Sequence, residues 1–208
     1  MKGLLLKDLY MMKKYCKSYL IIAAFFIAAS FVGNHNLFFV SYPILLCGMI
    51  PVNLLGYDER SRWLQYSDTL PYTKAQIVSS KYLIGLIAQT AMMIIIGIAQ
   101  IIGMNLNGEA QIINFLVLMP MMLMISTVIS SLTLPFIFKM GIEKGRIAYY
   151  FMIGIAVTAS LVASNIFGEN FQLRIERNII LAIFCLVGIG IYVLSWYLSI
   201  VFYKKREL

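Results

Sequence analysis

The chain has 208 residues, of which 61% are hydrophobic and 12% charged, and its mean hydropathy is +0.85. Soluble domains are nearer to half apolar and a quarter charged, so this composition excludes an ordinary soluble domain and indicates a membrane protein. The net charge of +8 is spread over the ends and connections of the chain. Because no basic soluble domain carries this charge, we expect no nucleic-acid partner.

Residues 1–17 predict an amphipathic helix. At about 100° per residue, one half of the helical wheel carries the lysines Lys2, Lys7, Lys13, Lys14 and Lys17. The apolar residues fall on the other half, with Asp8 as an exception among them. A basic amphipathic helix joined to a membrane span is typical of a helix that lies along the inner leaflet and contacts anionic lipid. A frayed basic tail is the alternative interpretation.

Apolar runs of about 18 or more residues with few charges are typical of membrane-spanning helices. We expect six, over roughly Ser18–Val32, Leu37–Leu55, Tyr82–Met104, Ile112–Phe138, Ala148–Phe167 and Ile179–Tyr203. The first run is the shortest and follows a basic start, as a signal peptide would. Its basic region is unusually long and other spans follow, so we expect it to be retained. The predicted fold class is an all-α membrane protein with six transmembrane helices.

The cationic residues predict the orientation of these spans. All but two of the 17 Lys and Arg residues fall on one side of a six-span arrangement, and the exceptions are Arg174 and Arg177. The positive-inside rule therefore places both termini and the connection between the second and third spans in the cytoplasm. The three cysteines show neither metal spacing nor a pair on the oxidising side, so we expect no disulfide.

That connection, the 57–81 segment, is the main polar interruption of the chain. We expect a short cytoplasmic helix from Asp58 to Thr69, with Asp58 and Glu59 near its positive end. Asp58 and Arg62 are four residues apart and are predicted to pair. The segment would then present a short charged helix to the cytoplasm.

An apolar stripe and a sharp corner complete the segment. Trp63, Tyr66 and Leu70 follow a spacing of three and then four residues, which places them on one face of the short helix. Pro71 ends this helix, because a proline biases the residue before it away from helical angles. The aromatic face is therefore predicted to be followed directly by a corner.

A second helix is predicted to begin after the corner. Thr73 is the N-cap and Gln76 completes a capping box, while Tyr72 and Ile77 occupy the positions of a hydrophobic staple. This helix runs through Lys81 into the third span. The corner therefore predicts a rigid entry into the membrane.

The motifs of common catalytic sites do not occur in the sequence. There is no GxxxxGK[ST], no HExxH and no GxSxG, and the lone His35 lies in a predicted outer loop. We expect no catalytic, cofactor-binding or metal-binding residues on this chain. No carboxylate is expected within a span, which argues against a proton-coupled carrier or an ion pump.

The polar residues within the spans are uncharged. Hydrogen bonds between helices are the favoured interpretation for most of them. Gln89 and Gln100 on the third span have an alternative interpretation, in which they line a translocation path for a substrate.

The order of these features resembles a known family. A basic start, two spans, the 57–81 segment, four more spans and the basic end "YKKREL" are similar to the membrane subunit of a bacterial ABC transporter of the ABC-2 export class. The resemblance is greatest to small six-span permeases whose relatives export amphipathic peptides such as phenol-soluble modulins. Its most specific part is "LPYTKAQIVSSKY", from Leu70 to Tyr82.

The resemblance implies a function and its partners. The chain would be a single permease domain over residues 1–208 in the bacterial cytoplasmic membrane, exporting an amphipathic peptide, lipid-like molecule or drug. The helix before Pro71 would be a coupling helix that docks on a separate ABC ATPase subunit, which binds ATP and Mg. The second half of the path would come from another copy of the chain or from a sister permease.

The resemblance also implies which residues meet the ATPase. The predicted interface consists of Asp58, Glu59, Arg60, Arg62, Trp63, Tyr66 and Leu70. Trp63 and Tyr66 would be the apolar anchors, since aromatic and arginine residues are the usual hot spots of interfaces. The alternative for the segment is an ordinary loop lying against lipid headgroups.

Two other functions compete with export. A membrane sensor or scaffold would recruit a cytoplasmic partner through the same 57–81 segment. An intramembrane enzyme is the least supported, because the expected catalytic residues do not occur. An ATPase with a P-loop encoded beside the chain would favour transport, whereas a kinase or regulator would favour sensing.

Overall fold

The computed structural model describes residues 2–15, 17–32, 37–67, 69–107, 112–145, 147, 158 and 177–205. The helices are α1 (Lys2–Tyr15), α2 (Lys17–Val32), α3 (Leu37–Gly48), α4 (Ile50–Arg60), α5 (Trp63–Ser67), α6 (Lys74–Asn107), α7 (Ile112–Met140) and α9 (Arg177–Lys205). The described residues contain no strand. The predicted all-α class is therefore confirmed for this part of the chain.

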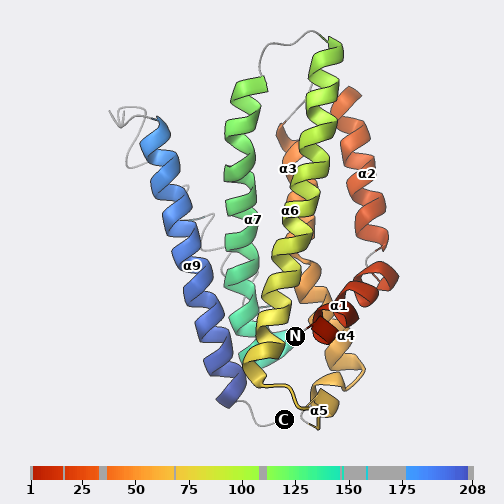
Figure 1. The fold of residues 1–208 in the computed structure, drawn as a ribbon, viewed down its shortest axis with the longest axis vertical. Helices are drawn as coiled ribbons and strands as arrows, with labels where there is room; N and C mark the ends of the chain where they lie inside the picture. The colour runs from red at the N-terminus through yellow and green to blue at the C-terminus, as the bar shows by residue number, and fades with distance from the viewer. Residues whose placement is uncertain are drawn as a thin grey trace.

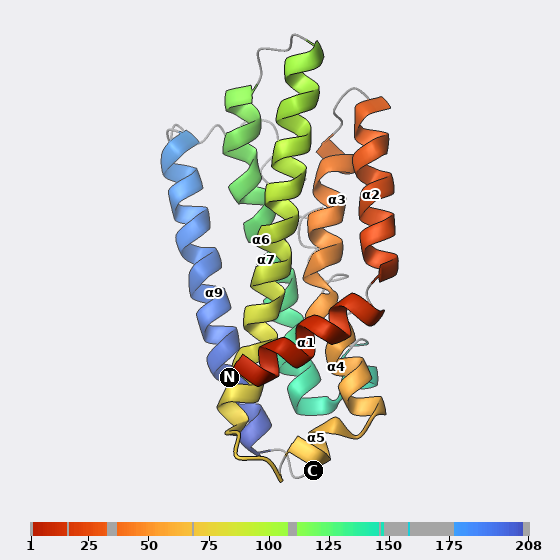
Figure 2. The ribbon, with the colours of Figure 1, turned by 45° about the vertical axis from the view of Figure 1, so that its right-hand side comes forward.

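The long helices lie side by side along the long axis of the molecule, and α1 crosses them near one end (Figures 1 and 2). The same end, here called the α5 end, holds α5, the start of α6 and the ends of α7 and α9 (Figure 1). Two cation–π contacts join the helix ends at the α5 end. Lys74 Nζ lies 5.7 Å from the centre of the Tyr203 ring, and Lys139 Nζ lies 5.1 Å from the centre of the Phe202 ring. Segments far apart in the sequence thus converge at the α5 end.

Three described helices are long and apolar enough to cross a membrane, over Lys74–Ile102, Met119–Met140 and Cys185–Lys205. They correspond to the third, fourth and sixth predicted spans. The first predicted span contains a shorter apolar helix over Lys17–Ala29. The fifth, Ala148–Phe167, lies almost entirely outside the described residues. By length and composition, the described residues therefore support three of the six spans.

The second predicted span is broken. The expected continuous run over Leu37–Leu55 is divided, because α3 ends at Gly48 and α4 begins at Ile50. Met49 N donates to Leu46 O at 3.0 Å, a bond that tightens the end of α3. Pro51 then occupies the first turn of α4, where its missing N–H does no harm. The α4 helix continues beyond the predicted end of the span.

Two apolar clusters hold the helices together. The first joins α2, α3, α4, α6 and α7 and consists of Ala23, Ile44, Cys47, Ile50, Leu54, Ile84, Ala88, Met92, Ile96 and Met119. The second lies at the α5 end and consists of Leu4, Val52, Leu55, Ile77, Val78, Tyr82, Leu134, Ile137, Phe138, Ile142 and Tyr203. Because the second cluster includes residues of α1, α4, α6, α7 and α9, it fixes the α5 end as a packed unit.

Candidate functional site

The chain turns sharply between α4 and α5. The α4 helix runs to Arg60, so Asp58 and Glu59 lie in its last turn and not at the positive end of a new helix, as was predicted. Arg62 N donates to Glu59 O at 3.2 Å, and Arg62 has a φ of 54°. Left-handed backbone of this kind is uncommon for residues other than glycine, and it redirects the chain. The predicted single helix over 58–69 is therefore wrong.

The helix after this turn, α5, covers only Trp63–Ser67. The rings of Trp63 and Tyr66 lie 5.5 Å apart, so these two residues share a face as predicted. Trp63 is half-buried, whereas Tyr66 is 57% exposed. Leu70 lies beyond the helix, in a turn where its N–H donates to Ser67 O at 3.2 Å. The predicted stripe therefore does not extend to Leu70 along one helix.

The entry into α6 follows the prediction. Thr73 N donates to Gln76 Oε1 at 3.1 Å, and Gln76 N donates to Thr73 Oγ1 at 3.3 Å. This reciprocal pair is a capping box, and α6 begins at Lys74. Tyr72 and Ile77 both pack in the second apolar cluster. The capping box is confirmed, and it fixes the start of a continuous 34-residue helix.

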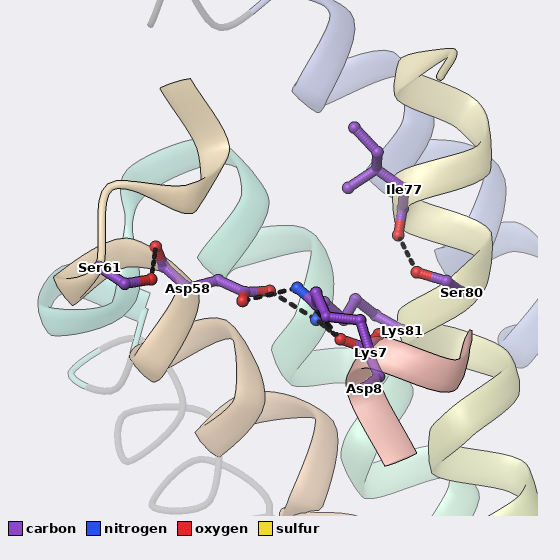
Figure 3. Close-up of polar contacts among 7 residues, drawn as sticks. All are labelled: Lys7, Asp8, Asp58, Ser61, Ile77, Ser80 and Lys81. Atoms are coloured by element: carbon purple, nitrogen blue, oxygen red, sulfur yellow. Dashed lines mark hydrogen bonds and ion pairs between the residues drawn. The ribbon is translucent and has the colours of Figure 1, made fainter. Parts of the chain in front are cut away.

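Four charged side chains meet beside this entry and are here called the charge ring (Figure 3). Lys7 and Asp8 come from α1, Asp58 from α4 and Lys81 from α6. Lys81 Nζ lies 2.6 Å from Asp8 Oδ1 and 2.6 Å from Asp58 Oδ2. Lys7 Nζ lies 2.8 Å from Asp58 Oδ1 and 3.3 Å from Asp8 Oδ1. Each charge thus has two neighbours of opposite sign.

The charge ring is almost completely buried. The side chains of Asp8 and Asp58 are each 1% exposed and that of Lys81 is 2% exposed, whereas Lys7 is 21% exposed. Burial lowers the pKa of Lys7, and the positive charge of Lys81 lowers it further, while the carboxylates of Asp8 and Asp58 raise it. Buried charges are tolerated when each is paired, and the two cations balance the two anions here.

The charge ring corrects the predicted pairing of Asp58, and the sequence alone does not predict the ring itself. The predicted pair of Asp58 with Arg62 is wrong, because Asp58 faces Lys7 and Lys81 while Arg62 is exposed. The sequence places Lys7 on the lysine half of the α1 wheel and Lys81 at the entry to the third span, and it predicts no partner for either. The signal that was present is Asp8, which lies on the apolar half of the wheel of α1. Its position marks the face of α1 that packs against α4 and α6.

Other contacts join α1 to the 57–81 segment. Lys7 Nζ lies 4.2 Å from the centre of the Trp63 ring, a cation–π distance. A Cβ added to Gly3 would lie 3.1 Å from Tyr72 Oη, so α1 approaches the corner before α6 closely. The helix α1 therefore contacts the segment at α5, through Trp63, and in the corner before α6, at Tyr72.

The remaining predicted interface residues lie on a different side of α4. Glu59 Oε2 accepts a hydrogen bond from Ile142 N at 3.1 Å. Glu59 and Arg60 also line a cleft of about 420 Å³ between α4 and the turn after α7, together with Glu143 and Lys144. The seven predicted residues therefore do not form one surface: Asp58 belongs to the charge ring, Glu59 and Arg60 to this cleft, Trp63 and Tyr66 to α5, and Arg62 and Leu70 to the turns on either side of α5.

Gln89 and Gln100 of α6 are both buried. Gln89 Nε2 donates to Ser126 Oγ at 3.0 Å and to Ser130 Oγ at 2.8 Å, and Ser126 Oγ donates to Ile44 O at 2.9 Å. These groups, here called the amide cluster, join α3, α6 and α7. They agree with the interpretation of Gln89 as a helix-to-helix hydrogen bond donor. A role for Gln89 and Gln100 in a substrate path stays a prediction.

Within the described ranges, no group of three or more His, Cys, Asp or Glu side chains is placed to hold a metal ion. The concentrated polar chemistry of the α5 end is electrostatic: paired charges, a capped helix and an exposed aromatic residue. Such an arrangement holds α1, α4 and α6 in register.

Comparison with known proteins identifies a family. Residues 3–204 match the family described as ABC-2 family transporter protein. Neither the curated proteins nor the solved structures include a significant match. The matched range includes all of the charge ring, the 57–81 segment and the amide cluster.

Proposed function

Because the chain belongs to the ABC-2 transporter family, we propose that it is the permease subunit of an ATP-driven exporter, coupled to a separate ATPase subunit through the 57–81 segment. A membrane transport role follows from the family, and permeases of this family typically pair with an ATPase subunit. The coupling role, the direction of transport and an amphipathic substrate are the proposed parts.

The observation that carries the coupling role is the path from α5 to α6. Tyr66 is exposed on α5, and the chain then passes a short turn and a capping box directly into α6. The helix α6 continues without a break from Lys74 to Asn107 and contains a candidate membrane span. A displacement of α5 by a bound partner would therefore move the start of a spanning helix.

The arrangement of the helices supports the proposed topology. The end of α7 and the start of α9 lie at opposite ends of the bundle (Figure 1). We propose that the fifth predicted span, Ala148–Phe167, joins these two ends, which would give six spans in all. Because α1 and the end of α9 share the α5 end, we place both termini in the cytoplasm of a bacterial cell, as the positive-inside rule requires.

The outer face of α1 supports contact with the inner leaflet. Leu6 and Tyr10 are 54% and 66% exposed, and Lys13 and Lys14 are exposed beside them. Exposed apolar residues next to lysines are typical of helices that lie at the surface of anionic lipid. A second copy of the chain or a sister permease would complete the translocation path, and ATP with Mg would bind to the ATPase.

Substitution of the two aromatic residues of α5 tests the proposal. In the double variant Trp63→Ala, Tyr66→Ala we expect normal membrane insertion and weaker association with the ABC ATPase subunit that partners the permease. The loss of one hot-spot aromatic typically costs about 2 kcal/mol, which is roughly 30-fold in the dissociation constant. Co-purification and ATP hydrolysis by the complex measure the effect.

The control is Tyr197→Ala, because Tyr197 is 65% exposed but lies on the candidate spanning part of α9. Association with the ATPase should be unchanged in this variant. Equal association of the double variant and the unmodified protein would show that α5 is not the coupling helix. Capture through α5 of a kinase or regulator instead of an ATPase would favour the sensor or scaffold function.

A further inference from the structure

The position of α5 depends on contacts outside the helix. Isolated helices of fewer than about 12 residues are marginal in water, and α5 has five. Its N-terminal residue Trp63 packs against the second apolar cluster and lies under Lys7. Lys7 Nζ is held in turn at 2.8 Å from Asp58 Oδ1. Lys7 therefore links the charge ring to α5.

We propose that Lys7, Asp8, Asp58 and Lys81 are positioning residues: the charge ring locks α1 in register with α4 and α6, and Lys7 thereby fixes the place of Trp63. On this proposal α1 helps to position the coupling helix α5, in addition to contacting lipid. The consequence for an ATPase rests on the proposed function, whereas the positioning of Trp63 does not.

Apolar packing alone would not define this register. Replacing a buried ion network with apolar residues of similar volume is often neutral or stabilising, so stability does not require these charges. Apolar contacts are non-directional, so they define a register less sharply than paired charges do. A shift of α1 by one residue in register would instead move Asp8 about 1.5 Å along the helix axis and turn it by about 100° around that axis, away from Lys81, which now lies 2.6 Å from it. A buried charge without its partner is costly, so the ring permits one register.

Of the four side chains in the charge ring, Lys7 is the one that contacts α5. It is the most exposed of the four, and it is shared between Asp58 and the face of Trp63. If Asp8 loses its charge, Lys7 and Lys81 repel each other while competing for Asp58. Because Lys7 is closest to water, it is the cation that leaves, and Trp63 then loses the group that covers its ring.

The fluorescence of Trp63 tests this proposal on the isolated permease. The chain has two tryptophans, Trp63 and Trp196, so Trp196→Phe leaves Trp63 as the single reporter. In this background we expect Asp8→Asn to raise the acrylamide quenching constant of Trp63 at least about twofold and to shift its emission to the red, although Asp8 does not belong to the 57–81 segment. The control Gln89→Leu removes a buried polar group elsewhere and should leave both signals unchanged.

A second variant covers the case in which Asp8→Asn does not fold. Lys7→Met, Asp8→Leu, Asp58→Leu and Lys81→Met together remove all four charges and should fold, with Trp63 more strongly quenched. Unchanged quenching in the folded variants, or equal changes with Asp8→Asn and Gln89→Leu, would overturn the proposal. Loss of the fold in the fourfold variant would also overturn it, because the ring would then be a requirement for stability. None of these outcomes depends on an ATPase, so failure of the proposed function would be seen separately.

Discussion

The charge ring and the amide cluster solve the same packing problem with different chemistry. Each joins three helices through buried polar groups: the ring joins α1, α4 and α6, and the amide cluster joins α3, α6 and α7. The ring uses full charges and lies at the α5 end, whereas the amide cluster is neutral and lies within two candidate spans. A charge at the centre of a bilayer costs at least about 2.5–3.5 kcal/mol, so neutral groups suit the spans and charges suit the end.

The two sites also differ in what happens when one group is lost. A hydroxyl of the amide cluster has a partner in its own helix, since Ser130 Oγ also donates to Ser126 O at 2.7 Å. When a charged side chain of the ring loses its partner of opposite charge, no neutral group can replace that partner. The amide cluster should therefore weaken gradually, whereas the ring should act as a unit.

Removal of one carboxylate from the ring should have the largest effect. We expect Asp58→Asn to lower the free energy of unfolding by about 3–5 kcal/mol, because Lys7 and Lys81 are left with one carboxylate in a buried site. Thermal unfolding in detergent measures it. The matched control is Glu59→Gln, one residue further along α4, which keeps an oxygen to accept the hydrogen bond from Ile142 N. Similar losses in the two variants would contradict the distinction between the ring and its surroundings.

A methyl group at Gly48 should have a smaller effect, on the amide cluster. Its Cβ would lie 2.8 Å from both Gln89 Nε2 and Ser126 Oγ, so the Gln89 hydrogen bonds have to shift. We expect Gly48→Ala to cost about 1–3 kcal/mol, measured as a lower Tm in detergent. Gly97→Ala is the control, because nothing lies within 4 Å of its added Cβ, and alanine should leave α6 unchanged or stabilise it slightly. A neutral Gly48→Ala would show that the amide cluster is not closely packed.

The parts of the fold that the sequence predicts correctly depend on local signals. The capping box at Thr73 and Gln76, the helical state of α1 and the long apolar helices α6, α7 and α9 all arise from patterns within one segment. Such patterns determine a helix and its ends before any tertiary contact forms. They predicted the entry into α6 and the aromatic pair of α5.

The parts that the sequence does not predict depend on distant or conformational features. Asp8 and Lys81 are 73 residues apart, and no local pattern couples them. Asp58 was assigned to Arg62 because the two are close in sequence, but α4 continues to Arg60 and the left-handed Arg62 turns away. Asp8 on the apolar half of the α1 wheel was the available signal, since a carboxylate on a packed face requires a cation from another helix.

The central claim is that the α5 end of the bundle, and not its membrane face, meets the ATPase. Site-specific photo-crosslinking tests it most directly, with the crosslinker placed at Tyr66 or at Ile98. These residues are 57% and 56% exposed, but Tyr66 lies on α5 and Ile98 on the candidate span of α6. We predict a crosslink to the P-loop ATPase from Tyr66 and none from Ile98. No crosslink from Tyr66, or equal crosslinks from both positions, would contradict the account.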